Sequence, residues 1–243
     1  MKTMNSNKIL KAAVAVVFGM CVLASRAQSE VNLQPAIANL PHITKTKSGH
    51  VGDPINFGLV GTREEIVAAM SAAGWFPADP VTLKTSLKIT GSVVLRRAYL
   101  DAPVSALFYQ GHIQDMAFEK PEGKSAAHRH HVRLWRVLDS GNEGRPVWLG
   151  SDTFDKSVGL SHVNGKITHH ISADIDVERE ALANDLVNSR RLLSTYFVKG
   201  TDPIKDARNG GGDHYHSDGL IHFAVIALGA NLQTAAPMQL GGN

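Results

Sequence analysis

Two runs of residues that read as neighbouring β-strands constrain the fold of this chain most strongly. The first run covers residues 130–136 and the second covers residues 147–152, with a turn-rich connector between them. Apolar and polar side chains alternate along both runs, which is the period of a β-strand. We therefore expect an antiparallel hairpin with one apolar face and one polar face.

Matching apolar residues across this hairpin predicts its register. Leu134 then lies opposite Leu149. The same register gives three further pairs on the polar face: His131 with Asp152, Arg133 with Gly150, and Trp135 with Trp148. Directly opposed residues have Cβ atoms about 4.5–5.5 Å apart, which permits a hydrogen bond between His131 and Asp152. A slip of one residue would bury the polar set, so only shifts of two residues compete.

The polar face of the hairpin is a candidate ligand-binding surface. Its candidate residues are His131, Arg133, Trp135, Trp148 and Asp152. A carboxylate-oriented histidine beside an arginine and an aromatic wall can bind an anionic group, and the histidine can act as an acid or a base. The alternative is a structural cross-strand pair beside tryptophans that cover the sheet.

Histidines are concentrated in the second half of the chain, where ten of the twelve lie between His112 and His222. Imidazole nitrogens are ligands for zinc and other transition metals. The candidate ligands of a divalent metal are His130, His131, His169 and His170. A further set pairs the strand positions His128 and His130 with His214 and His216. Nothing in the sequence brings those two pairs together, and solvated loop histidines are the alternative.

Residues 1–27 have the features of a secretory signal. Three lysines precede an apolar stretch over residues 12–24, and Ser25-Arg26-Ala27 is a small-x-small cleavage site. The stretch is shorter than the roughly 18 apolar residues that span a bilayer, and an uncleaved anchor is the alternative. We expect an exported protein, periplasmic or secreted, with no transmembrane segment in its mature chain.

Cleavage changes the charge of the protein. The full chain has 25 basic and 22 acidic residues, and four of the basic ones lie in the signal, so the mature chain has a net charge of −1. The basic isoelectric point therefore gives no support for nucleic-acid binding. Cys21, the only cysteine, also leaves with the signal. The mature protein is thus predicted to lack disulfides, thiolate nucleophiles and cysteine-based zinc sites.

The rest of the chain predicts one domain. We expect an extended N-terminal arm over residues 28–52, the domain over 53–230 and a disordered tail over 231–243. A strand over 55–60 precedes a helix capped by Thr62 and Glu65. Further helices are expected from Asp79 to about 89 or 91 and from about 176 to 193. Strand pairs are expected around Gly111-His112 and Asn164-Gly165, and a buried central strand over 220–228. This order favours an α+β fold, mainly an antiparallel sheet with about three helices packed on it.

Other polar motifs have structural interpretations. Asp174 and Asp176 can bind a metal, but they precede a helix, where carboxylates are favoured as caps. The glycines at 210–212 lack the lysine and the spacing of a phosphate-binding loop. No G-x-S-x-G elbow surrounds Ser151 or Ser161. His222, in an apolar run, is expected to be a satisfied buried histidine.

Together these segments resemble the LssY C-terminal domain family. The matching motifs are Gly111 with QDMAF (114–118), RHHVRLW (129–135), VWLGSDTFD (147–155), SHVNGKITHHI (161–171), DIDVERE (174–180) and SDG (217–219). They span about residues 53–228. His112-Ile113 departs from the pattern, where a basic residue and a proline are expected. The resemblance implies no established activity. Its members occur alone and fused to membrane proteins of the DedA and type 2 phosphatidic-acid phosphatase types, which hints at envelope or lipid-phosphate work.

Three functions remain open at this point, and the residues do not decide whether the chain is an enzyme. The first is an exported domain that binds an anionic, lipid-phosphate-like ligand or a membrane partner. The second is a metal-assisted hydrolase acting on a phosphoester, with a metal-activated water as nucleophile. Its residues would come from His130, His131, Asp152, His169 and His170. The third is a purely structural interaction module.

Overall fold

The computed structural model describes residues 36–78, 106–122, 128–141, 144–163, 165 and 167–228. The helices in this part are α2 (Arg63–Ala72) and α5 (Ile175–Asn188), with one further helical turn at 36–38. The strands are β1 (Ile43–Lys45), β2 (Val51–Pro54), β3 (Phe57–Val60), β4 (Phe76–Pro77), β5 (Phe108–Tyr109), β6 (His112–Ile113), β7 (Met116–Pro121), β8 (Arg129–Leu138), β9 (Val147–Leu160), β10 (Ile167–Ile171), β11 (Leu192–Lys199), β12 (Ile204–Arg208), β13 (His214–Ser217) and β14 (Leu220–Ile226). The signal, the helix predicted from Asp79 and the C-terminal tail lie outside the described residues.

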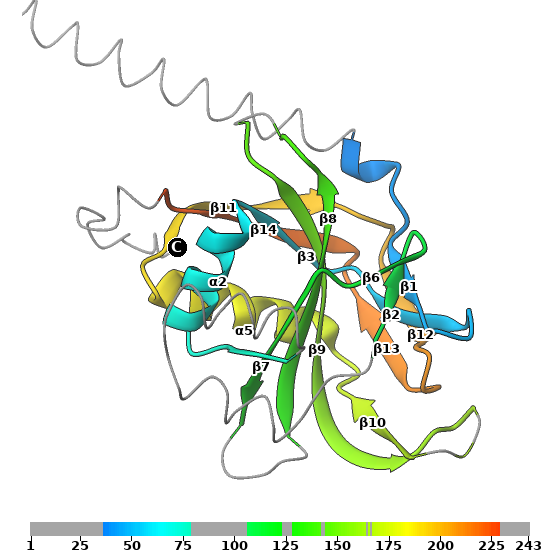
Figure 1. The fold of residues 1–243 in the computed structure, drawn as a ribbon. Helices are drawn as coiled ribbons and strands as arrows, with labels where there is room; N and C mark the ends of the chain where they lie inside the picture. Colours follow the sequence, from blue (N-terminus) through cyan, green and yellow to red (C-terminus); the bar gives the residue numbers. More distant parts are fainter. Residues whose placement is uncertain are drawn as a thin grey trace, which may run out of the picture.

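An eight-stranded sheet is the centre of the molecule. Its strand order is β11-β14-β3-β9-β8-β7-β4, and β10 pairs with the far end of β9. All of these pairs are antiparallel except β14 with β3. Helices α2 and α5 lie on one side of the sheet, while β1, β2, β6 and the β12–β13 hairpin lie on the other (Figure 1). The predicted α+β class, with a mainly antiparallel sheet and helices packed on it, is confirmed.

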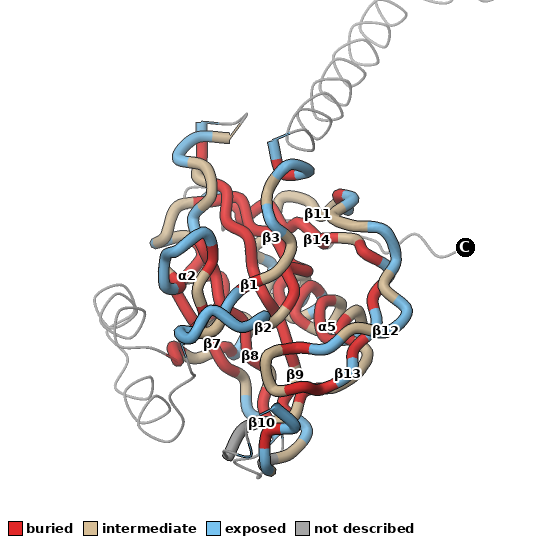
Figure 2. The backbone as a smooth tube through the Cα atoms, turned by 90° about the vertical axis from the view of Figure 1, so that its right-hand side faces the viewer, coloured by how far each residue is buried: buried red, intermediate tan, exposed pale blue. Residues whose placement is uncertain are grey.

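Both faces of the sheet are covered by apolar packing. One core joins α2 and α5 to residues such as Val132, Leu134 and Trp148. A second core lies on the opposite face, where Trp135 and Leu149 meet residues from the N-terminal segment and β5. Buried backbone accordingly runs along β3, β8 and β9, while exposed backbone is concentrated in the outer hairpins (Figure 2). The central strands therefore have no solvent-facing side at the middle of the sheet.

The helix ends follow local chemistry. Thr62 and Glu65 form the predicted capping box of α2, because each side chain accepts a bond from the other residue's backbone N–H. Helix α5 begins at the predicted cap Asp174 but ends at Asn188, five residues before the predicted end at Leu193. Arg190 has a φ of 57°, a left-handed conformation that a helix cannot continue through. Leu193 consequently lies in β11.

Two predicted hairpins form with different pairings. Around Gly111, β5 pairs with the two-residue strand β6, whereas the longer run at 114–119 contributes β7, which pairs with β8. Residues 161–166 connect β9 to β10, since Leu160 is the partner of Ile167. The hairpin expected at Asn164-Gly165 therefore exists, but it has a longer loop than the predicted two-residue turn.

Candidate functional site

The main hairpin, β8 with β9, forms in a register that differs from the predicted one by one residue. Leu134 lies opposite Gly150 rather than Leu149, and His131 lies opposite Thr153 rather than Asp152. The physical reason is that both faces of the hairpin are buried, so the alternation of polar and apolar residues does not select one register. The observed register needs a glycine at position 150, because any Cβ there would come within 2.9 Å of the Leu134 side chain.

This correction separates the predicted site residues onto two faces. His131, Arg133 and Trp135 share the face of the second core, whereas Trp148 and Asp152 lie on the helix face. The two tryptophans are buried on opposite sides of the sheet, at 2% and 1% exposure. Their indole N–H groups donate to the carbonyl oxygens of His112 and Gly61, respectively. They form no common aromatic wall.

His131 has a carboxylate partner, although not the predicted one. Its Nε2 atom lies 2.8 Å from Oδ2 of Asp155, and both side chains are almost completely buried. Asp155 follows Thr153 by two residues, so it lies on the same face of β9 as Thr153. A carboxylate beside an imidazole fixes the orientation and the tautomer of the ring.

Arg133 and Asp53 extend this polar cluster. Arg133 Nη1 lies 3.6 Å from Oδ2 of Asp53, which belongs to β2. Asn209 Nδ2 donates to the other Asp53 oxygen at 3.2 Å. Burial raises the pKa of the Asp53 carboxyl, and the neighbouring Asp155 and Asp213 carboxylates raise it further, against the opposing effect of Arg133 and the Asn209 bond. The Asp53 carboxyl thus has two further buried carboxylates and the Arg133 guanidinium group among its charged neighbours.

The histidines proposed as metal ligands do not share one site. His130 lies on the helix face, where its Nδ1 atom is 2.7 Å from Oε2 of Glu178. His131 pairs with Asp155 on the opposite face, and the side chain of His169 lies outside the described part of the structure. His214 and His216 pair separately with Asp206 and Asp174. His130, His214 and His216 therefore do not come together, as the hypothesis of a four-histidine metal site would require.

His170 instead belongs to a cluster with His162 and Asp213. Their ligand atoms all lie within 4.8 Å of one another, and this is the one such group of three among the described residues. His170 Nδ1 lies 2.6 Å from Asp213 Oδ1, and His162 Nε2 lies 3.7 Å from the same oxygen. Two imidazoles and a carboxylate form a ligand set that zinc and other transition metals accept, at about 2.0–2.2 Å from each donor.

Loops and glycines hold this cluster together. Asn209 Oδ1 accepts from the backbone N–H of Asp213, and Asp213 Oδ2 accepts from the backbone N–H of Ile171. A Cβ at Gly159 would lie 2.7 Å from Nε2 of His170, so the bare backbone there makes room for the ring. Gly212 likewise has no room for a side chain, because a Cβ there would lie 2.8 Å from the Cβ of His162.

The balance of charge at this end of the sheet suits a cation. Asp53, Asp155 and Asp213 are three largely buried carboxylates; Arg133 lies beside Asp53, and the buried Arg129, which pairs with Glu119, lies opposite Asp155 in the sheet. Histidine side chains aside, these four carboxylates, Glu119 included, and two guanidinium groups carry an excess of two negative charges when all are ionised, and the raised pKa of Asp53 reduces that excess. Buried charge is costly unless it is paired or coordinates a metal. One divalent ion would neutralise that excess.

Sequence reasoning found His170 and His131 but missed Asp53, Asp155, Asp213 and His162. Asp155 ends the motif VWLGSDTFD, and Asp213 directly follows the glycine loop, so both were visible as acidic residues in conspicuous positions. Their proximity depends on β2 and on the loop between β12 and β13. Contacts across more than forty residues, as between His170 and Asp213, have no local signal in a single sequence.

Asp152 lies in a separate acidic environment beneath α5. Neither of its carboxyl oxygens has a hydrogen-bond partner of good geometry among the described residues, and the residue is 1% exposed. Burial raises its pKa well above the ordinary value, and the negative charges of Glu178 and Asp185 on α5 add to this effect. The neutral form of this carboxyl is therefore more favoured than it is for an exposed aspartate. It is not paired with any of the predicted site residues on the other face.

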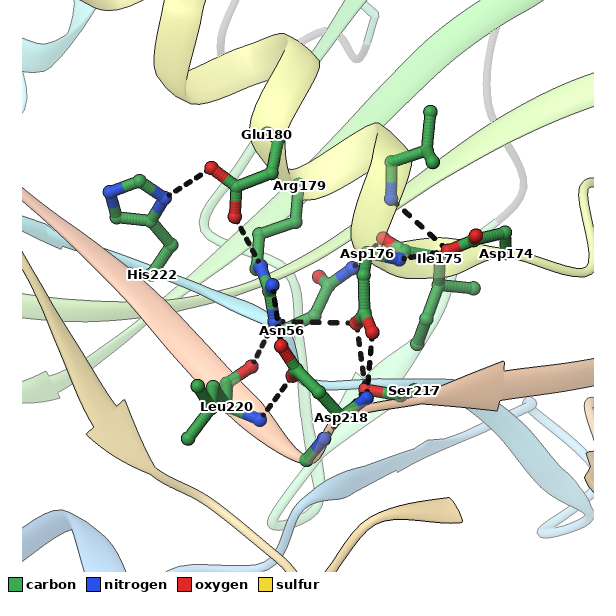
Figure 3. A network of polar contacts seen from close by, with 12 residues as sticks. Asn56, Asp174, Ile175, Asp176, Arg179, Glu180, Ser217, Asp218, Leu220 and His222 are labelled. Atoms are coloured by element: carbon green, nitrogen blue, oxygen red, sulfur yellow. Dashed lines mark hydrogen bonds and ion pairs between the residues drawn. The ribbon is translucent and has the colours of Figure 1, made fainter. Parts of the chain in front are cut away.

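Arg179 on α5 is the centre of another polar network (Figure 3). Its guanidinium donates to Asp218 through both terminal nitrogens, at 2.8 and 3.0 Å, and also to Glu180, Asp176 and the carbonyl of Leu220. Asp176 is further occupied by Ser217 and by the backbone N–H of Asp218. These contacts fasten α5 to the β13–β14 turn, so the network is structural.

The capping role that the sequence favours for the acidic pair is confirmed at Asp174. Asp174 accepts bonds from the N–H groups of Asp176 and Val177, as an N-cap does. His222 is buried, and its Nδ1 atom lies 3.1 Å from Oε2 of Glu180. The expectation of a buried histidine with a polar partner is therefore confirmed. Burial lowers the pKa of the His222 ring, and the adjacent Glu180 opposes that effect.

The architecture defines the chain as an α+β domain in which a mainly antiparallel sheet carries a polar cluster at the β9–β10 end. Residues 37–221 match the family described as LssY C-terminus, and the chain belongs to this family. No curated protein and no solved structure shows significant similarity to it. Within the described residues, no helix is both long and apolar enough to cross a membrane.

Proposed function

We propose that this chain is an exported cell-envelope domain that binds one divalent transition-metal ion through His162, His170 and Asp213. The observation that carries the proposal is the convergence of two imidazoles and one carboxylate within 4.8 Å. The nearby carboxylates of Asp53 and Asp155 supply the negative charge that a divalent ion would balance. Export follows from the signal-like features of residues 1–27.

The chemistry best suited to this site is metal-assisted hydrolysis of a phosphoester. Three protein ligands leave coordination positions for water, which is typical of catalytic rather than structural sites. A metal lowers the pKa of bound water, so that a hydroxide forms near neutral pH. A metal held by His162, His170 and Asp213 would supply this hydroxide; its oxygen would bond to phosphorus as the bond to the leaving oxygen breaks, and the leaving oxygen would take up the proton lost by the water. Asp53 is linked through Asn209 to the loop that carries Asp213.

A purely anion-binding surface on the β8–β9 hairpin has less support. Arg133 lies against Asp53, and carboxylates outnumber cations around it. Trp135 and Trp148 are buried on opposite faces, so they offer no contact surface for a ligand. An envelope lipid or a membrane protein remains the proposed partner because of the fusions that the family resemblance implies.

The test is elemental analysis of the untagged mature protein, purified from the exported fraction. We expect about one zinc, manganese, iron or cobalt ion per chain, removable by a chelator. His170→Ala and Asp213→Asn should each weaken metal binding by at least about tenfold. His214→Ala is the matched control, because His214 is exposed and pairs with Asp206 outside the cluster.

The outcomes separate the proposed functions. A folded protein that neither contains metal nor takes up added zinc would overturn the metal site and leave a structural interaction module. Metal loss in His214→Ala as large as in His170→Ala would show that binding is not at this cluster. A metal-loaded protein is then assayed with bis(p-nitrophenyl) phosphate, and absence of turnover would remove the hydrolytic part of the proposal.

A further inference from the structure

Exposed apolar side chains occur on the segments that lie near the glycine loop at 210–212, beside the proposed metal site. Val51, Leu160 and Val163 are 50%, 64% and 57% exposed and are three of the seven large hydrophobic residues exposed in the described part of the chain. They belong to β2, to the end of β9 and to the loop that follows it. Isolated exposed apolar residues need no explanation, but a group around one site does.

Short contacts place these segments together. A Cβ at Gly210 would lie 2.4 Å from the carbonyl oxygen of Val51, and a Cβ at Gly212 would lie 3.3 Å from Val163. The backbone N–H of His162 donates to the carbonyl of Gly211 at 3.0 Å. Val163 and the proposed ligand His162 therefore lie against the loop through their side chains and Val51 through its backbone, whereas Leu160 ends β9 opposite Ile167, on the face of the β9–β10 ribbon away from His170. Figure 2 views the molecule from the side on which β1, β2 and the β12–β13 hairpin lie.

The same segments carry a marked excess of exposed positive charge. Over residues 45–51, 156–163 and 205–212 the exposed charged side chains are Lys45, Lys47, Lys156, Lys205, Arg208 and Asp206. The acid among them, Asp206, pairs with His214. Thr46, between the two lysines of β1 and its turn, lies 3.0 Å from a Cβ placed at Gly210. Arg208 donates to the carbonyl of Gly212.

The interior of the site and the surface around it therefore have opposite charge. The interior is acidic, because it contains Asp53, Asp155 and Asp213, and this charge suits a metal ion. The surrounding surface, defined here as the rim, consists of the apolar and basic residues of the three segments named above. Exposed apolar side chains among lysines and arginines are the combination that binds the interface of an anionic bilayer. An acidic soluble partner would explain the cations but not the apolar side chains.

We propose that the rim docks on the surface of an anionic phospholipid bilayer and that the phosphoester acted on at the metal site belongs to a lipid headgroup. The lipid substrate rests on the proposed function, whereas docking on the bilayer is argued from the rim alone. Leu160 and Val163 enter the interfacial layer, and the exposed lysines contact lipid phosphates. His162, between those two apolar residues in sequence, then faces the headgroups.

The test is sedimentation of the full mature chain with vesicles of phosphatidylcholine, with and without phosphatidylglycerol. We expect the protein to sediment with the vesicles that contain phosphatidylglycerol, and less as salt is raised. The double variant Leu160→Ser, Val163→Ser should bind at least about tenfold more weakly. Val177→Ser is the matched control, because Val177 is 59% exposed on α5, away from the rim.

Each outcome bears on the docking proposal separately from the metal. Equal sedimentation with both kinds of vesicle, or unchanged binding by the double variant, overturns it. Equal loss of binding in Val177→Ser overturns the assignment to the rim. The same assay with chelator-treated protein and with His170→Ala keeps the proposals distinct. Vesicle binding without metal binding refutes the proposed function alone, and metal binding without vesicle binding refutes the docking surface alone.

Discussion

His131 Nε2 lies 2.8 Å from Asp155 Oδ2, although the residue directly opposite His131 in the sheet is Thr153. The contact is therefore diagonal, and it joins β8 to the part of β9 that also pairs with β10. The imidazole and the carboxylate are both buried. This pair connects the central sheet with the hairpin that carries His162 and His170.

Removing the carboxylate of this pair should destabilise the domain. Asp155→Ala leaves a buried imidazole nitrogen without its acidic partner, and leaving a buried polar group unpaired typically costs about 1–3 kcal/mol. Urea unfolding of the mature protein, followed by circular dichroism, measures the change. Asp202→Ala is the control, because Asp202 is exposed and pairs with the exposed Lys199, and its stability should equal that of the parent. Equal stability of Asp155→Ala and the parent would contradict a stabilising role for the pair.

Asp152 should make stability fall as the pH rises. Its pKa in the folded protein is well above the ordinary value of 3.8, so above that pH the folded chain retains a proton that the unfolded chain releases. Raising the pH from about 4 towards the folded-state pKa therefore favours unfolding. Asp152→Asn keeps the shape and removes this titration.

The variant should be more stable than the parent at pH 7, and the difference should vanish near pH 4. Unfolding by urea over a series of pH values measures it. The groups that face Asp152 are Glu178 and Asp185 on α5, and Glu178→Gln should reduce the same pH dependence. A difference between Asp152→Asn and the parent that is constant from pH 4 to 8 would rule out a neutral buried carboxyl.

Local sequence signals predicted the local parts of the fold. The capping box of α2, the cap at Asp174 and the buried strand at 220–226 depend on neighbours in the chain, and each is confirmed. The register of β8 with β9 depends on what covers each face. Because helices cover one face and the N-terminal segment covers the other, Leu134 and Trp135 are both buried, and the pattern of apolar residues could not choose between registers.

The candidate site was only partly predictable for the same reason. The expected pair of His131 with Asp152 does not form, and the carboxylate beside His131 is that of Asp155, as the observed register requires. The cluster of His162, His170 and Asp213 needs the β12–β13 loop to reach the β9–β10 hairpin. Asp53 comes from the stretch at the start of the predicted domain, where the sequence has no chemical motif. Such contacts are set by tertiary packing.

Arg179→Lys should destabilise the protein although it conserves charge. The guanidinium makes five hydrogen bonds to four residues, and an ammonium group has only three donors in a different geometry. We expect a loss of about 2 kcal/mol in the free energy of unfolding. Arg136→Lys is the control, because Arg136 pairs with the exposed Asp139. A loss of similar size in both variants would show that the network around Arg179 adds nothing beyond charge.

Gly159→Ala should weaken metal binding without changing any proposed ligand. The new methyl group would lie 2.7 Å from His170 Nε2 and 3.0 Å from its Cδ2, so the ring must shift from the position in which Nδ1 contacts Asp213. Changes that misplace a metal ligand typically reduce affinity by about 10–100-fold. Zinc titration by calorimetry measures the effect, and circular dichroism checks the fold. Gly111→Ala is the control, because its Cβ would meet nothing within 4 Å, although its positive φ strains the backbone. Since the added methyl group touches the His170 ring, unchanged zinc affinity in Gly159→Ala would mean that His170 is not a ligand.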